Sequence, residues 1–397
     1  NKKNKKQQTK TNNKQKQKNK HNNKQKQTTN NNNNQTENKE QIMLDVQDNP
    51  APEVHDDPIA VDPRQFAAKV NSWLPHDIML TDAWFPLAHS FAVAKKPIRR
   101  AVYSHPYFIW RKPDGSLVAA ETHPNDQLAA KKSEYTDEAG HYPVIEKYGY
   151  VWGWLGKPEN AAPEHIPSIP YLPEDGGLPL HMLGTVRFDC CAPLSLENLI
   201  DLTHADFIHA DVVGDEKMDK ETVEVFHDSE TITMVRTCVN KSVAPIMKIF
   251  GGVRDDVQQV RQVIRIYLRS HAAIAYGRFS PGDNVQLFHP CVPETRDRTR
   301  LDYAMNTSNV KKTNLFRYMM PKASYKVSRQ DSSMTSPQSP RYMRPEKRKD
   351  LHSPLDEAGQ KYRVLMLALA ERQARGDFTY RDNVSSDCSD IIGYEKA

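Results

Sequence analysis

Short apolar runs separated by turn residues open the part of the chain that is rich in hydrophobic side chains. Asp114-Gly115 lies between two of these runs and is typical of a tight β-hairpin turn, and Tyr148-Gly149 separates another two. This pattern predicts a small all-β domain over residues 74–160. Its strand-like runs are 84–88, 98–103, 107–111, 117–120, 142–146 and 150–156.

A second set of apolar runs follows a proline-rich linker at 161–180. Polar and apolar residues alternate through these runs, which favours an antiparallel sheet with one covered face. From residue 356 to 375, apolar side chains recur at helical spacing. The sequence therefore predicts an α+β fold: a curved antiparallel sheet with packed helices at 181–376, followed by a C-terminal tail at 377–397. The strand-like runs here are 184–189, 222–226, 231–235, 260–268, 285–288 and 300–305.

The N-terminal region has a different composition from the rest of the chain. Residues 1–42 are almost entirely Asn, Lys, Gln and Thr, which cannot bury enough apolar surface to offset the entropy of ordering, so we predict a disordered tail. Residues 43–73 are predicted to be a linker. Twelve lysines and two glutamates give residues 1–40 a charge of +10, while the whole chain carries +5. The folded body is therefore mildly acidic, and we expect no specific nucleic-acid partner.

Composition also excludes several classes of protein. No run approaches the roughly 20 apolar residues that span a membrane, so no membrane partner is expected. The N-terminus lacks the apolar core of a secretory signal. The five cysteines form no CxxC motif and no regular spacing, which favours a reducing, cytoplasmic location.

Two histidines five residues apart, His204 and His209, are the candidate chemistry of the second domain. Imidazole binds iron, zinc, copper or nickel, and two histidines with a distant carboxylate form the facial triad of a non-haem iron(II) site. In an ideal helix, residues five apart point about 140° away from each other. Both rings can therefore reach one metal only if the helix distorts or ends between them. The alternative is a helix whose histidines are merely hydrogen-bonded.

The surroundings of this pair resemble one family. Residues 198–204 followed by His209 resemble the iron-site signature of the catalytic (α) subunits of Rieske non-haem iron oxygenases, closest to the branch of aromatic O- and N-demethylases. The resemblance covers about residues 77–375. It includes the strands that open and close a Rieske domain, a third-ligand segment and a last helix, found here at 84–87, 142–156, 329–340 and 355–363.

The resemblance implies an Fe(2+) site with His204, His209 and Asp331 as ligands, in a catalytic domain of the helix-grip kind. Asp350 and Asp356 are rival carboxylates that fit the third-ligand segment less well. 

Two further residues of the signature carry expected roles. In the family, the aspartate that matches Asp201 links an iron ligand to a cluster histidine of the neighbouring subunit and carries the electron path. Asn198 lies one helical turn earlier, where it either approaches the iron or makes a cap or surface hydrogen bond.

One departure from the family dominates. A Rieske cluster needs two cysteines and two histidines, but no cysteine precedes Cys190, and the segment from Glu121 to His141 is short and polar. We therefore predict a β domain without its own [2Fe-2S] cluster. Electrons would come from a reductase or ferredoxin carrying an iron–sulfur centre, with NAD(P)H as the indirect donor.

The predicted activity is that of an iron(II)-dependent monooxygenase or demethylase that uses O2 on a small aromatic or heterocyclic substrate. The alternative is a non-catalytic subunit of a Rieske oxygenase complex. A homotrimer or a hetero-oligomer is expected.

Residues on the sheet segments are candidates for the wall of a substrate pocket, with core packing as the alternative. They are Phe250, Phe279, Phe288 and His289. The cysteines at 190, 191, 238 and 291 are interpreted as small buried hydrophobic residues rather than ligands.

Overall fold

The computed structural model describes residues 78–125, 133–172, 182–249, 251–307, 314–344 and 350–395. The predicted tail at 1–42, the linker at 43–73 and most of the second half of the 161–180 linker lie outside this described part. Within it, no helix is long and apolar enough to cross a membrane.

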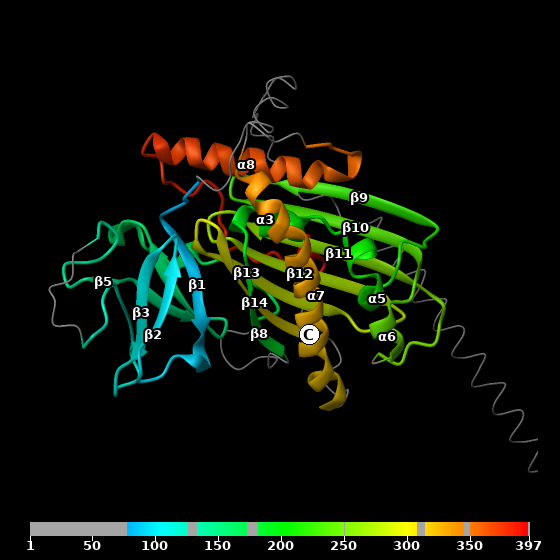
Figure 1. Cartoon of the computed structure of the whole chain (residues 1–397), viewed down its shortest axis with the longest axis horizontal. Helices are drawn as coiled ribbons and strands as arrows, with labels where there is room; N and C mark the ends of the chain where they lie inside the picture. The colour runs from blue at the N-terminus through cyan, green and yellow to red at the C-terminus, as the bar shows by residue number, and fades with distance from the viewer. Residues whose placement is uncertain are drawn as a thin grey trace, which may run out of the picture. The chain divides into compact units, whose positions relative to one another are not determined.

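Two small antiparallel sheets form the N-terminal β domain, in agreement with the pattern of apolar runs (Figure 1). Tyr107 stacks on Tyr142 with ring centroids 4.0 Å apart, and its hydroxyl donates to the Trp154 carbonyl at 2.8 Å. These aromatic side chains give a small domain a dense core. The sheets are β1 (Ala83–His89), β7 (Tyr150–Leu155) and β6 (Val144–Lys147), then β2 (Ile98–Val102), β3 (His105–Arg111), β4 (Leu117–Ala120) and β5 (His141–Tyr142).

Both predicted turns are present. β3 pairs with β4 across Asp114-Gly115, where the Asp114 carboxylate accepts hydrogen bonds from the Ser116 backbone N–H (2.9 Å) and hydroxyl (2.7 Å). β6 pairs with β7 across Tyr148-Gly149, whose φ values of 56° and 73° are those of a type I′ hairpin turn. Glycine makes such a turn inexpensive because it has no Cβ.

A seven-stranded antiparallel sheet forms the second domain (Figure 1). Six of its strands match the predicted runs. The seventh, β12 (Ala272–Ser280), was not predicted because its first four residues are Ala-Ala-Ile-Ala, and alanine is depleted in strands. The order is β8 (Met182–Phe188), β14 (Arg298–Thr307), β13 (Val285–Thr295), β12, β11 (Val257–Tyr267), β10 (Thr231–Ser242) and β9 (Lys220–His227).

Helices cover one face of this sheet (Figure 1). The longest, α7 (Asn314–Tyr342), continues through Pro337 and Pro340. The predicted C-terminal helix is α8 (Glu357–Ala374). The others on this face are α3 (Ala192–Ile200), α4 (Ala205–Ile208), α5 (Ala210–Val213) and α6 (Pro245–Ile249). The short α9 (Ser389–Ile392) lies on the opposite face, where Ile392 is buried. Turns of 3-10 helix lie at Ser90–Ala92, Pro158–Asn160, Pro163–His165 and Pro354–Asp356.

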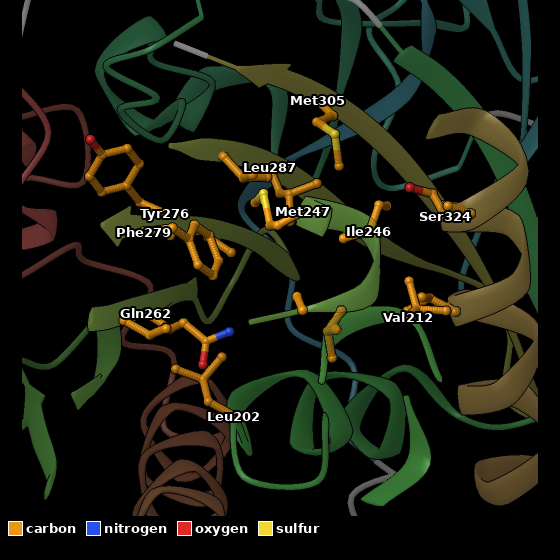
Figure 2. A pocket seen from close by; sticks show the side chains of 18 of the residues that line it. Leu202, Val212, Ile246, Met247, Gln262, Tyr276, Phe279, Leu287, Met305 and Ser324 are labelled. Carbon is orange, nitrogen blue, oxygen red and sulfur yellow. The ribbon is translucent and has the colours of Figure 1, made fainter. Parts of the chain in front are cut away.

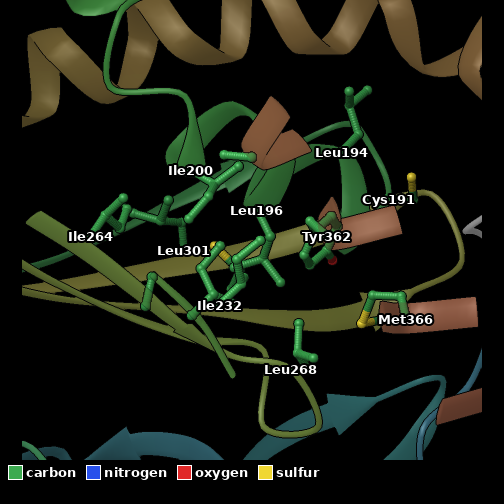
Figure 3. Close-up of a cluster of buried hydrophobic side chains, with 14 of the residues drawn as sticks. Cys191, Leu194, Leu196, Ile200, Ile232, Ile264, Leu268, Leu301, Tyr362 and Met366 are labelled. Atoms are coloured by element: carbon green, nitrogen blue, oxygen red, sulfur yellow. The ribbon is translucent and has the colours of Figure 1, made fainter. Parts of the chain in front are cut away.

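The core between the sheet and the helices is apolar (Figure 3). Leu196 and Ile200 of α3 and Tyr362 of α8 are fully buried against Ile232 of β10 and Ile266 of β11. Burial of such side chains contributes about 1.5–3 kcal/mol each. This packing fixes α3, whose C-terminal end leads directly into the His204 segment.

The second face of the sheet is covered as well, whereas the sequence predicted one covered face. Trp152 and Tyr150 of the β domain pack on Phe288 of β13, with the Tyr150 and Phe288 ring centroids 5.2 Å apart. Val384 and Ile392, from the stretch interpreted as a C-terminal tail, are buried in the same cluster. The alternating pattern missed this because Arg and Thr side chains also occupy the second face. The cysteines at 190, 191, 238 and 291 are free and buried, as interpreted from the sequence, and so is Cys388.

Candidate metal centre

Three side chains meet at one point: His204 and His209 from the segment after α3, and Asp331 from α7. His209 Nε2 lies 3.0 Å from Asp331 Oδ1, and His204 Nε2 lies 3.3 Å from each of these two atoms. Ligand bonds of about 2.1 Å at right angles would hold three donor atoms about 3.0 Å apart. Two imidazoles and a carboxylate therefore form a triangle that fits one face of an octahedral metal ion. Within the described residues, this is the single cluster of three such groups.

The chain reaches this geometry by interrupting its helix twice. α3 ends at Ile200, and Asp201 has an extended backbone, with φ −80° and ψ 93°. His204 precedes the short α4, and His209 lies between α4 and α5 with φ −114° and ψ 17°. The condition that the helix must end or distort between the histidines is thus met.

The other ring nitrogen of each histidine is held by an oxygen. His204 Nδ1 donates to the Asp201 carbonyl, and His209 Nδ1 donates to Gln330 Oε1 at 3.0 Å. With a proton on each Nδ1, loss of the Nε2 protons would leave both Nε2 lone pairs available to a metal ion beside the Asp331 carboxylate. Such hydrogen bonds fix the tautomer and raise the basicity of a metal ligand.

The charges of the cluster are coupled. Burial alone would lower the pKa of His204, but the hydrogen bond and negative charge of Asp331 outweigh it and raise that pKa. Burial would raise the pKa of Asp331, but its hydrogen bonds to the two imidazoles lower that pKa well below its usual range. Without a metal, the Asp331 carboxylate therefore favours the protonated form of His204 more than water does.

Asn198 and Asp201 take different positions around the cluster. Asn198 Nδ2 donates to Asp331 Oδ1 at 3.0 Å, so its side chain orients the carboxylate rather than capping a helix. The Asp201 carboxylate accepts from the backbone N–H and hydroxyl of Thr203, at 2.9 and 2.6 Å. Only its carbonyl contacts the His204 ring.

The rival carboxylates are engaged elsewhere. Asp350 accepts from Arg363 at 2.7 Å, and Asp356 accepts from the backbone N–H of Ser353 at 2.5 Å. Neither belongs to the cluster of metal-binding groups.

A buried charge network holds α4 in place between the two histidines. Asp206 on α4 is 2% exposed and accepts from Arg236 at 2.5 Å and from Lys241 at 2.8 Å, both on β10. Arg236 also pairs with Glu221 at 2.5 Å. Two cations thus face two anions, and the network ties the segment between the ligands to the sheet.

An apolar cavity of about 240 Å³ adjoins the Asp331 side of the cluster (Figure 2). Of the four candidate wall residues, Phe279 and His289 line it. Burial lowers the pKa of His289 to about 4, so that imidazole is neutral. Phe288 does not line it but packs in the core beside Trp152, and Phe250 lies outside the described residues.

A second hollow, of about 670 Å³, adjoins the His204 side. Asn198, Asp201 and His204 line it together with Glu197 and Arg363, and none of the described residues lines both spaces. The cluster therefore lies between an apolar cavity and a polar hollow.

Gln330 is a positioning residue that sequence analysis missed. Replacing it with leucine should weaken iron(II) affinity about 10–100-fold, because the His209 ring loses the partner of its Nδ1–H. Iron titration of the wild type and the variant measures this. Gln338→Leu is the matched control, since Gln338 lies on the same helix and its amide donates only to the Met334 carbonyl. Equal affinities for Gln330→Leu and Gln338→Leu would contradict the assigned role.

The coupled charges also predict a pH dependence. A metal needs the neutral His204 imidazole, and the raised pKa means that the metal-free protein holds this proton more tightly than free histidine does. Iron affinity should therefore be independent of this group at alkaline pH and fall about tenfold per pH unit once the pH drops below that pKa. Calorimetric titration in buffers of different ionisation enthalpy measures the proton release. No proton release on the acid side would contradict this expectation.

The chain is similar in sequence to oxygenase subunits of O-demethylases. A family model, the vanillate O-demethylase oxygenase C-terminal domain, matches residues 188–372, a range that holds all three candidate ligands. The vanillate O-demethylase oxygenase subunit of Pseudomonas sp. (strain HR199 / DSM 7063) is 24% identical over 235 residues, covering 49% of this chain and 65% of that protein. The oxygenase component of dicamba O-demethylase from Stenotrophomonas maltophilia is 25% identical over 162 residues, covering 32% and 47%. Both alignments span less than two thirds of the relative.

Solved structures share the fold over a longer range. Dicamba monooxygenase bound to 3,6-dichlorosalicylic acid has a TM-score of 0.64 at 18% identity, covering 75% of this chain and 99% of that one. Dicamba monooxygenase with non-haem iron and dicamba has a TM-score of 0.59 at 17% identity, covering 74% and 98%. The predicted α+β fold, a small β domain followed by a sheet with packed helices, is confirmed.

Proposed function

Because this chain belongs to the α-subunit family of Rieske non-haem iron oxygenases, in its O-demethylase-like branch, we propose that it is an oxygenase component that acts on aromatic or heterocyclic compounds. Its activity would be that of an iron(II)-dependent monooxygenase or demethylase that uses O2 and electrons from a partner protein. The observation that carries the proposal is the triangle of His204, His209 and Asp331 beside an apolar cavity.

The cavity supports a substrate of one ring. An apolar cavity of about 150 Å³ holds benzene, so about 240 Å³ leaves room for a ring with substituents. Leu202, Met247, Phe279 and Leu287 surround this space (Figure 2). Such walls favour a flat apolar body and exclude water from the face of the metal that the substrate approaches.

The chain's own residues would hold and orient the reacting groups. Iron(II), when bound, supplies the redox chemistry by which dioxygen is reduced. His204, His209 and Asp331 would hold the ion, Asn198 keeps the carboxylate oriented, and Gln330 keeps the His209 ring oriented. In a demethylation, a methyl ether, O2, two electrons and two protons give a hydroxyl compound, formaldehyde and water.

The electrons would come from outside the chain, from a reductase or ferredoxin with an iron–sulfur centre and ultimately from NAD(P)H. Two observations support this source. Residues 74–160 contain no cysteine to bind a Rieske cluster. The hollow beside Asp201 and His204 is bordered by Met334, Leu351 and Leu355, whose side chains are 46%, 96% and 43% exposed. Exposed apolar side chains gathered on one part of a surface mark a candidate docking surface.

Iron analysis and turnover test the proposal. Protein reconstituted anaerobically with iron(II) should hold about one iron per chain. With an iron–sulfur reductase as donor, it should release formaldehyde from an aromatic methyl ether only when O2 is present. Protein that holds no iron after reconstitution would rule the proposal out.

A non-catalytic subunit of a Rieske oxygenase complex is the second candidate, favoured by the missing cysteines of the β domain. This function predicts co-purification with a cluster-bearing homologue in a hetero-oligomer, and an activity of that complex that His204→Ala leaves unchanged. A homotrimer that turns over with an added reductase would instead favour the oxygenase.

A further inference from the structure

One polar side chain in the apolar cavity has no partner. Gln258 on β11 is 1% exposed and lines the cavity, and neither its amide nitrogen nor its carbonyl oxygen has a hydrogen-bond partner among the described residues. Buried polar groups are almost always hydrogen-bonded, because an unpaired one destabilises the fold. The unpaired amide of Gln258 therefore indicates a hydrogen-bond partner that is not part of the folded chain, such as a bound ligand.

The strand directs this amide into the cavity. Side chains alternate between the two faces of a strand, so Gln258, Val260 and Gln262 share one face of β11, and all three line the cavity. Gln262 points into the same space (Figure 2), and its Oε1 is also unpaired among the described residues. The cavity thus presents amide groups along an otherwise apolar wall.

The charged groups around the cavity are already paired within the protein, Asp331 with the two histidines and Lys241 with Asp206. Lys241, opposite Gln258 in the strand register, is the single cation among the described lining residues, and its ammonium group lies 2.8 Å from Asp206. Asp206 is shared with Arg236, which also pairs with Glu221. An anionic substrate would therefore have to compete with Asp206 for Lys241, at a desolvation cost.

From the unpaired amide and the paired charges, we propose that Gln258 is a specificity-determining residue that selects neutral ring compounds with an amide-like edge, one donor beside one acceptor. This inference rests on the proposed function for its aromatic substrate. It departs from the anions vanillate and toluene-4-sulfonate that name several relatives. A carboxamide or lactam edge satisfies both Gln258 atoms, whereas a carboxylate satisfies only the donor.

Binding of three probes of similar shape tests the inference without turnover. Benzamide offers a donor and an acceptor, acetophenone an acceptor only, and benzoate a negative charge. Calorimetry on the iron-loaded full chain should show benzamide binding about tenfold more tightly than acetophenone, and benzoate binding weakest. Gln258→Met keeps the length of the side chain and should bring the benzamide-to-acetophenone ratio close to one.

Thermal stability gives a second readout. Removing a buried unpaired amide should raise the Tm of Gln258→Met by about 2–6 °C, so the variant is expected to fold. Gln286→Met is the matched control: Gln286 is another buried glutamine of the sheet with an unpaired Oε1, but it does not line the cavity. It should leave the binding of all probes unchanged.

Several outcomes would overturn the inference: benzoate as the tightest probe, no binding of any probe at millimolar concentration, or benzamide affinity unchanged within about twofold in Gln258→Met. Iron content is measured separately. Protein that binds benzamide as expected but holds no iron would overturn the proposed function and leave the specificity of Gln258 standing.

Discussion

Replacing His204 or His209 by alanine is expected to weaken iron(II) binding by more than about 100-fold and to abolish O2-dependent turnover. Even residues that only orient a metal ligand cost 10–100-fold when replaced, and removing a ligand leaves two donor groups where three are needed. Metal analysis after anaerobic reconstitution and gel filtration would show the iron content falling from about one per chain to a trace.

His123→Ala is the matched control for these variants. His123 lies in the polar segment of the β domain that begins at Glu121, and its ring contacts Phe108. Its loss should change neither iron content nor turnover. Iron that persists in the His204→Ala and His209→Ala proteins, or is lost in His123→Ala, would show that the metal does not bind at the proposed triangle.

Asp206→Asn is expected to lower the free energy of unfolding by about 3–5 kcal/mol. Asp206 is buried between Arg236 and Lys241. Its loss of charge would leave Arg236 with Glu221 alone and Lys241 with the Asp215 carbonyl. Since the same carboxylate holds α4 on β10, iron affinity should fall with it. Urea unfolding of the metal-free protein measures the first effect, and iron titration measures the second.

An exposed ion pair provides the comparison. Glu357→Gln removes the partner of Lys361 on the surface of α8 and should change the free energy of unfolding by less than about 0.5 kcal/mol. The double variant Asp206→Leu with Arg236→Met should be more stable than the sum of its single changes predicts. Additive losses would mean that the buried pair is not coupled.

Local sequence patterns predict most of the strands and turns of the sheets. Alternation and turn chemistry predicted the hairpins at Gly115 and Gly149, and they predicted six of the seven strands of the large sheet. β12 was not predicted because its alanines have no local strand preference. This segment forms a strand because it pairs with β11 on one side and β13 on the other, which is a tertiary effect.

The sequence predicted the three candidate ligands, but not the hydrogen bonds that orient them. The family resemblance named His204, His209 and Asp331, which lie together. The bonds of Asn198 to Asp331 and of Gln330 to His209 join residues 133 and 121 positions apart, so no local pattern contains them.

The long helix that supplies Asp331 was also missed. α7 contains Pro337 and Pro340, residues that usually end a helix. Its position comes from packing on α3 and β8, and Tyr342 near its end donates to Glu197 of α3 at 2.6 Å.

The two spaces on either side of the three ligands have no lining residue in common within the part of the chain that the structure describes. The substrate and the electron donor would then bind and dissociate independently of each other. Neither would have to leave before the other could bind. Steady-state lines at several donor concentrations would intersect in the manner of a random-order mechanism rather than run parallel. A saturating donor would raise kcat while the dissociation constant of the substrate stays the same.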